Sequence, residues 1–169
     1  MKWITALVLG FFIIYSSLAT FEWYFEKEKV ESVAGYAVSL SDVPLWELAN
    51  MGSVIEYLLE NDTSSDVLRE RVYQYSIHAR TLSYSSTILY VSTKDEKYRL
   101  FGIATHNLES FFVRVGKKPN CKEVLKENLD VLKRIGEELK KKKRITGLTK
   151  EDAKKILDLS SQLRILDET

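Results

Sequence analysis

The chain has 169 residues, of which 29% are charged, with a net charge of +1 and a sequence pI of about 7.7. This near-neutral balance gives no electrostatic reason to bind nucleic acid, and we expect no nucleic-acid partner. Cys121 is the only cysteine, which excludes an intrachain disulfide and a cysteine-based zinc cluster; we expect its thiol to be a small buried group. Lysine and glutamate dominate the charges, a composition typical of thermophilic proteins.

The first predicted element is an apolar helix over residues 3–21, a stretch without a charged side chain. About 19 helical residues rise roughly 28 Å, close to the ~30 Å hydrocarbon core of a bilayer. Aromatic residues stand at its two ends, where a spanning helix meets the lipid headgroups: Trp3, Trp23, Tyr24 and Phe25. The sequence therefore predicts a transmembrane signal-anchor in residues 1–25 that contacts the lipid bilayer through residues 3–21.

Two alternatives remain for this stretch. The small residues before Ala19 also suit a secretory signal cleaved near Ala19, which would release the protein. A buried core helix is the other alternative, although no side of the stretch is polar. Retention is favoured because the apolar run continues to Phe21 and aromatic residues follow it. A leader as short as Met1-Lys2 stays cytoplasmic, so we expect the bulk of the chain to be extracytoplasmic, which the glycosylation sequon at Asn61 fits.

Residues 26–41 are predicted to be a juxtamembrane transition. The charged run Glu26–Glu31 can prolong the membrane helix into water, and Gly35 is where we expect that helix to loosen. The residues between Gly35 and Ser41 alternate weakly between apolar and polar, but one short run has no partner strand, so they are predicted to be irregular.

Residues 42–169 are predicted to form a soluble helical-bundle domain. A helix begins at Ser41 or Asp42, with Pro44 in its first turn. Further helices are expected from residue 66 to about 91, from a capping box at Thr93 to Gly116, from Asn120 to about 139, and after a capping box of Thr149 and Asp152. Each carries apolar residues at three-four spacing. The predicted fold is all-α, an N-terminal transmembrane helix followed by an antiparallel bundle of four to five helices.

The two histidines, His78 and His106, lie at similar depth if their helices form a hairpin, and Glu109 is one turn from His106. Such a cluster is a candidate zinc or iron site, but half-buried histidines that bond to neighbouring polar groups are the more common case. The sequence contains no phosphate-binding loop, nucleophile elbow or zinc-protease motif. We therefore expect no cofactor and no enzymatic activity.

The longest predicted helix is rich in tyrosine and serine, and tyrosine combines apolar area with a hydroxyl group. This composition indicates a protein interface, with three candidate residues: Tyr73, Tyr84 and Tyr90. The basic run from Lys140 to Arg144 suits either lipid headgroups or the negative dipole end of a helix, and neighbouring acidic residues favour the second.

These features favour a single-pass membrane-anchored helical protein with an interaction or structural role, as a subunit or accessory of a membrane complex or surface assembly. One alternative is an extracytoplasmic bundle that binds a small ligand near Tyr75, His78, His106 and Glu109, which resembles bacterial sensor ectodomains in architecture only. A metal-dependent enzyme on the same residues is the third hypothesis.

Overall fold

The computed structural model describes the backbone of residues 2–165 and side chains from Tyr15 onward, and its described part contains helices and no strand. The prediction of an all-α fold is confirmed. The elements are α1 (Lys2–Glu60), α2 (Ser65–Thr93), α3 (Glu96–Val115), α4 (Cys121–Lys140), a 3₁₀ turn η1 (Ile145–Gly147) and α5 (Lys150–Ser160).

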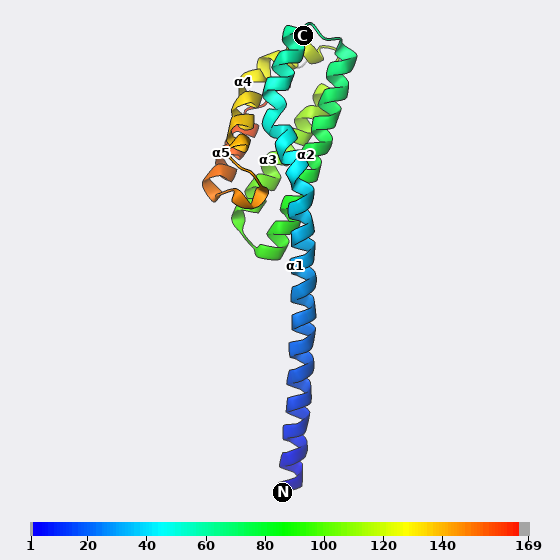
Figure 1. Cartoon of the computed structure of the whole chain (residues 1–169), viewed down its shortest axis with the longest axis vertical. Coiled ribbons are helices and arrows are strands. Elements are labelled where there is room, and N and C mark those ends of the chain that lie inside the picture. Colours follow the sequence, from blue (N-terminus) through cyan, green and yellow to red (C-terminus); the bar gives the residue numbers. More distant parts are fainter. Residues whose placement is uncertain (1, 166–169) are drawn as a thin grey trace.

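Half of α1 stands apart from the rest of the molecule (Figure 1). Its N-terminal part projects as a single rod, and its C-terminal part joins the bundle, where Ala37 is its first buried residue. Within the bundle, α1 packs beside α2 and α4, α2 also packs on α3, and α5 lies mainly on α3. Consecutive long helices run in opposite directions.

The predicted break between the rod and the bundle is wrong, because α1 runs without interruption through residues 26–41. The Ser41 hydroxyl donates to the carbonyl oxygens of Ala37 (2.8 Å) and Val38 (2.7 Å), so it bonds back into the helix instead of capping a new one. Pro44 lies inside α1 and removes one backbone donor. Burial of the flanking core residues offsets that loss, and the predicted boundaries at 25/26 and 41/42 fall inside one helix.

The predicted membrane anchor lies mostly outside the residues whose side chains are described, and Trp3 is among those outside. Among the described residues, no helix combines the length and apolarity needed to cross a membrane. Trp23, Tyr24 and Phe25 are exposed on the rod. The ring of Phe25 lies 4.6 Å from that of Phe21, measured between centroids.

The caps position the remaining helices. Thr149 and Asp152 form the predicted capping box at the start of α5. The predicted box at Thr93 is wrong, because Thr93 is the last residue of α2 and Asp95 caps α3 by accepting a hydrogen bond from the Lys97 amide (3.1 Å). Lys94 takes a left-handed conformation, with φ of 57°, that turns the chain between the two helices. This turn brings Asp95 to the N-cap position of α3.

Candidate interaction surface

The outward side of α2 carries a row of large apolar side chains. The buried residues of α2 occupy its inner side, so residues half a turn away point to solvent. This α2 outer row consists of Tyr73, Ile77, Tyr84 and Val91. Tyr73 is 61% exposed and Tyr84 is 65% exposed. Two of the three predicted interface tyrosines therefore lie on an open surface, whereas Tyr90 is partly buried against the core.

The neighbouring helix α1 carries a second row that the sequence analysis missed. Its inner side is buried through Ala37, Leu45 and Leu48. From Tyr36 to Trp46, four large side chains are exposed on the outward side, and they form the α1 outer row: Tyr36, Leu40, Val43 and Trp46. The sequence signal for this row was the near absence of charge between residues 32 and 46, where Asp42 is the only charged residue.

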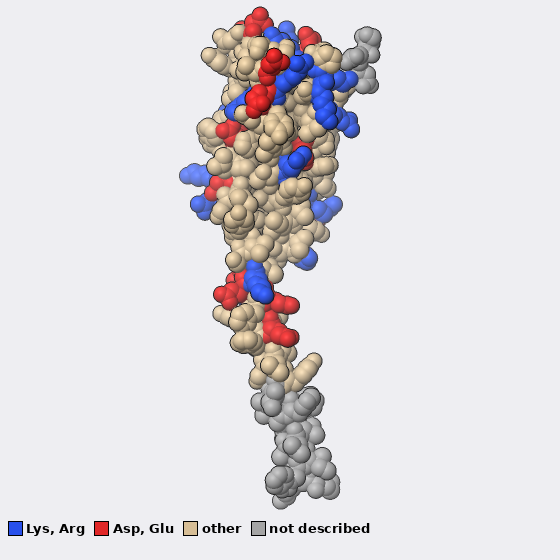
Figure 2. Space-filling model, turned by 90° about the vertical axis from the view of Figure 1, so that its right-hand side faces the viewer, with Lys and Arg blue, Asp and Glu red and all other residues tan. Residues whose placement is uncertain are grey.

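The two outer rows together form an uncharged surface, here called the α1–α2 face. Between Val72 and Thr93 only Arg80 is charged, in a chain with 29% charged residues. Figure 2 shows uncharged atoms over most of the middle of the bundle, with charged side chains gathered at its upper end. Arg80 itself lies beside Tyr73 and Ile77, and its charge is balanced by Glu109 on α3 at 2.7 Å.

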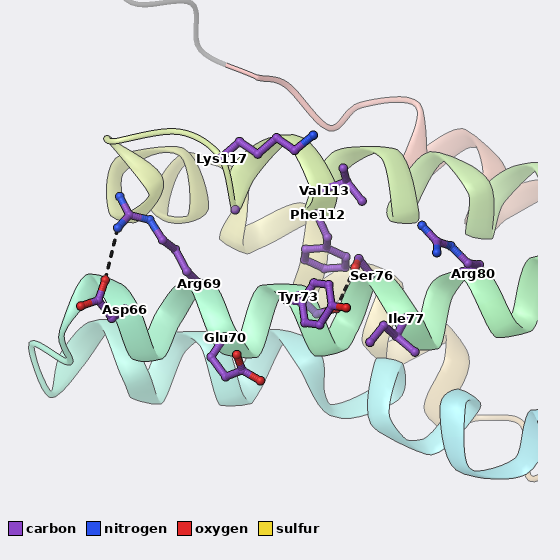
Figure 3. A pocket seen from close by; sticks show the side chains of 11 residues that line it. Asp66, Arg69, Glu70, Tyr73, Ser76, Ile77, Arg80, Phe112, Val113 and Lys117 are labelled. Atoms are coloured by element: carbon purple, nitrogen blue, oxygen red, sulfur yellow. Dashed lines mark hydrogen bonds and ion pairs between the residues drawn. The ribbon is translucent and has the colours of Figure 1, made fainter.

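A shallow groove extends the face toward α3 (Figure 3). Its volume is about 500 Å³, and Tyr73 and Ile77 from α2 meet Phe112 and Val113 from α3 along it. Charged groups lie at its edges, including Arg69, which donates to Asp66 over 3.3 Å. The groove is large enough to receive apolar side chains of a docked protein.

A polar network beneath the face holds α1 and α2 together. The Arg71 guanidinium donates to the Glu47 carboxylate (2.9 Å) and to the hydroxyl of fully buried Tyr75 (3.1 Å). Burial raises the pKa of Tyr75, so its hydroxyl stays protonated. Because Glu47 belongs to α1 and Arg71 to α2, this network fixes one row relative to the other.

The two histidines lie on different sides of the bundle. His106 is exposed on α3, with its Nδ1 3.5 Å from an oxygen of Glu109, which also accepts from Arg80. His78 is half-buried on the side of α2 that faces α1, where burial lowers its pKa. The structure thus brings His106 and Glu109 together but not His78. In the described part of the chain, no three histidine, cysteine, aspartate or glutamate residues converge to hold a metal ion.

Three of the five residues in the basic run at the end of α4 form ion pairs with other parts of the fold. Lys141 pairs with Glu138 (2.7 Å), Lys142 with Asp152 (2.6 Å), and Arg144 lies 3.8 Å from Asp42. Glu138 also accepts from Lys155 on α5 at 2.8 Å. These ion pairs connect α4 and its following loop to α5 and α1, so this cluster of charge serves the fold.

The one cysteine is internal. Cys121 is fully buried at the start of α4, and burial raises the pKa of its thiol. A thiol with a raised pKa in an apolar site has little thiolate, so the side chain has the character of a small apolar group.

Comparison with known protein families, with curated proteins and with solved structures gave no match for this chain.

Proposed function

We propose that the chain is a single-pass membrane-anchored helical protein that acts by binding another protein chain through the α1–α2 face, as a subunit or accessory of a membrane complex or surface assembly. The observation that carries the proposal is this face, with exposed aromatic and aliphatic rows and almost no charge. Tyrosine and tryptophan are enriched and charged residues depleted at the centres of protein interfaces. A large apolar patch left in water would otherwise favour aggregation.

The anchor in this proposal is residues 3–21, supported by their uncharged composition and the aromatic residues that follow. The N-terminus is cytoplasmic and the bundle extracytoplasmic. With Phe25 at the membrane surface, the helix up to Ala37 rises about 18 Å at 1.5 Å per residue. The α1–α2 face therefore begins about 18 Å above the bilayer, a height that suits a partner held in the same membrane.

Sidedness is tested by thiol labelling at the far end of the molecule. The turn at Asn61 is exposed and lies opposite the N-terminus (Figure 1). Because Cys121 is buried, the natural thiol gives a low background. In intact cells, we expect a membrane-impermeant maleimide to label Asn61→Cys and to leave the unchanged chain unlabelled. Labelling of Asn61→Cys only after cell lysis would place the bundle in the cytoplasm.

The interaction is tested by native mass spectrometry of the chain released gently from its own membranes. We expect the natural chain to carry the mass of at least one further chain. Trp46→Glu and Tyr84→Glu place a charge on the face and should each remove that mass, because an unpaired carboxylate is costly in an interface. Lys126→Glu, at an exposed position of α4, is the matched control and should retain it. A bare monomer for the natural chain, or equal loss in the control, would contradict the proposal.

A further inference from the structure

We infer that the partner on the α1 side of the face is a second copy of this chain, bound as a parallel dimer with the two α1 helices side by side. This inference rests on the proposed function, since it uses the membrane anchor, and it names the partner of the same face.

The spacing of the outward residues of α1 suits a helix partner. Tyr36, Val43, Asn50 and Tyr57 follow one another at intervals of seven residues, and Trp46 falls three residues after Val43. All are exposed except Asn50, which is half-buried. A repeat of 3.5 residues per turn keeps one seam facing a neighbouring helix over several turns, as in two-stranded coiled coils. The seam runs for about three heptads along the part of α1 that belongs to the bundle.

The membrane anchor fixes the orientation in which a second copy can contact this seam. Two copies inserted by the same N-terminal segment point the same way, so the two-fold axis of a dimer lies along the membrane normal, and α1 runs parallel to its mate. In such an isologous contact each residue near the axis meets its own counterpart. Like charges would then repel, so a self-complementary seam has to be uncharged. Tyr36, Val43, Asn50 and Tyr57 meet this condition.

The exposed side of α4 is charged and therefore cannot form such a self-complementary seam. Glu123, Asp130 and Glu137 are exposed at intervals of seven residues along that helix, and each would face its own copy in a parallel pair. Within the single chain the Asn50 amide donates to the Trp46 carbonyl oxygen of its own helix over 2.9 Å. Asn50 still adds a positive argument, because its amide has a second N–H, and an asparagine at one seam position lets two parallel helices exchange amide hydrogen bonds and fixes their register.

The area of the α1 side is sufficient for a specific contact. Aromatic side chains present on the order of 150–250 Å² each, and three of them on α1 are more than half exposed: Tyr36, Trp46 and Tyr57. With Leu40 and Val43 they offer on the order of 500 Å² per copy, which gives about 1,000 Å² in total, the size that a specific interface has to reach.

The test uses the purified full-length chain with no other protein present. In native mass spectrometry from detergent we expect about twice the 19.5 kDa of one chain. A disulfide forms only between Cα atoms within about 7 Å, so Val43→Cys near the axis should crosslink to its copy under mild oxidation. Lys126→Cys is the control and should crosslink at least about tenfold less. A monomer, or equal crosslinking of the two variants, would overturn the dimer.

The outcomes separate this inference from the proposed function. A purified monomer whose native extract carries a different protein, lost in Trp46→Glu, refutes the dimer and leaves the interaction role standing. A monomer in both purified and native samples refutes both. A dimer that Trp46→Glu converts to monomer, with the helical content unchanged, supports both.

Discussion

The side-chain amide of Asn128 pairs with the backbone of Arg164 through two hydrogen bonds, each 2.8 Å long. The amide nitrogen donates to the Arg164 carbonyl oxygen, and the amide oxygen accepts from the Arg164 N–H. A third bond joins the same nitrogen to the Val124 carbonyl oxygen at 2.8 Å. Asn128 is buried in α4, and Arg164 lies beyond the end of α5. One asparagine therefore fastens the segment after the last helix to the bundle.

We expect Asn128→Leu to release this segment. The change leaves the N–H and carbonyl groups of Arg164 without their protein partners. Because Arg164 is itself exposed and water can reach it, we expect a loss near the lower end of the roughly 1–3 kcal/mol that an unpaired buried group costs. Urea unfolding of the full chain should show that loss, and hydrogen exchange at Arg164 should accelerate. Asn61→Leu, at an exposed turn, is the control and should leave the exchange at Arg164 unchanged. Unaltered exchange at Arg164 in Asn128→Leu would show that other contacts hold the segment.

Close approach of α1 and α4 requires Gly136. A Cβ atom added there would lie 2.7 Å from the Ala49 carbonyl oxygen, a backbone atom that cannot move alone. We expect Gly136→Ala to lower the free energy of unfolding by roughly 1–3 kcal/mol, because overpacking forces the helices apart. Gly35→Ala is the matched control, since nothing lies within 4 Å of its added Cβ. That change should stabilise α1 by up to about 1 kcal/mol through helix propensity. Thermal unfolding followed by circular dichroism measures both, and equal melting temperatures would contradict the contact.

Local signals were enough to predict the helices. The inner stripe of α1 through Leu45, Leu48 and Ile55 is buried as its spacing predicts, and Thr149 caps α5. The same local signals misplaced the start of the bundle helix. Ser41 is a good cap in isolation, but it bonds back into a helix that already exists. Whether a cap residue begins a helix or lies inside one depends on packing, which local sequence does not contain.

Which residues share a site depends on how each helix is rotated about its own axis. The similar depth of His78 and His106 made a shared site a candidate, but His78 faces α1 and His106 faces solvent. The position of a residue along the helix axis follows from counting residues. The direction in which its side chain points depends on which side of the helix is buried. Facing direction also separates the three predicted interface tyrosines, because Tyr73 and Tyr84 point to solvent whereas Tyr90 is partly buried against the core. The α1 outer row was apparent only once α1 and α2 were seen side by side.

Removal of Glu47 and removal of Arg71 should shift the pKa of His78 in opposite directions. Burial lowers the pKa of His78, Glu47 raises it and Arg71 lowers it. We therefore expect Arg71→Met to raise the pKa of His78 and Glu47→Gln to lower it further, as followed by NMR titration. Arg71→Met should also cost roughly 1–3 kcal/mol of stability, because the Tyr75 hydroxyl loses its donor. Shifts of the same sign in both variants would show that His78 does not sense this ion pair.

The free energy of unfolding should depend on pH through the ionisation of Asp152. Burial alone would raise its pKa, but hydrogen bonds from Lys142 and Thr149 outweigh burial and lower the pKa to about 2 from an ordinary 3.8. The carboxylate is 19% exposed, and the shift corresponds to roughly 2 kcal/mol. Because the folded-state pKa is lowered, this stabilisation is complete above about pH 5 and is lost as the pH falls toward 2.

Asp152→Asn removes the charge and should therefore destabilise the chain by roughly 2 kcal/mol at pH 7, with the difference from the natural chain shrinking toward zero near pH 2. Asp158→Asn, at an exposed position on the same helix, is the control and should have little effect at either pH. Urea unfolding at a series of pH values measures both variants. A deficit in Asp152→Asn that stays constant down to pH 2 would mean that helix capping geometry, and not the charge on Asp152, stabilises the start of α5.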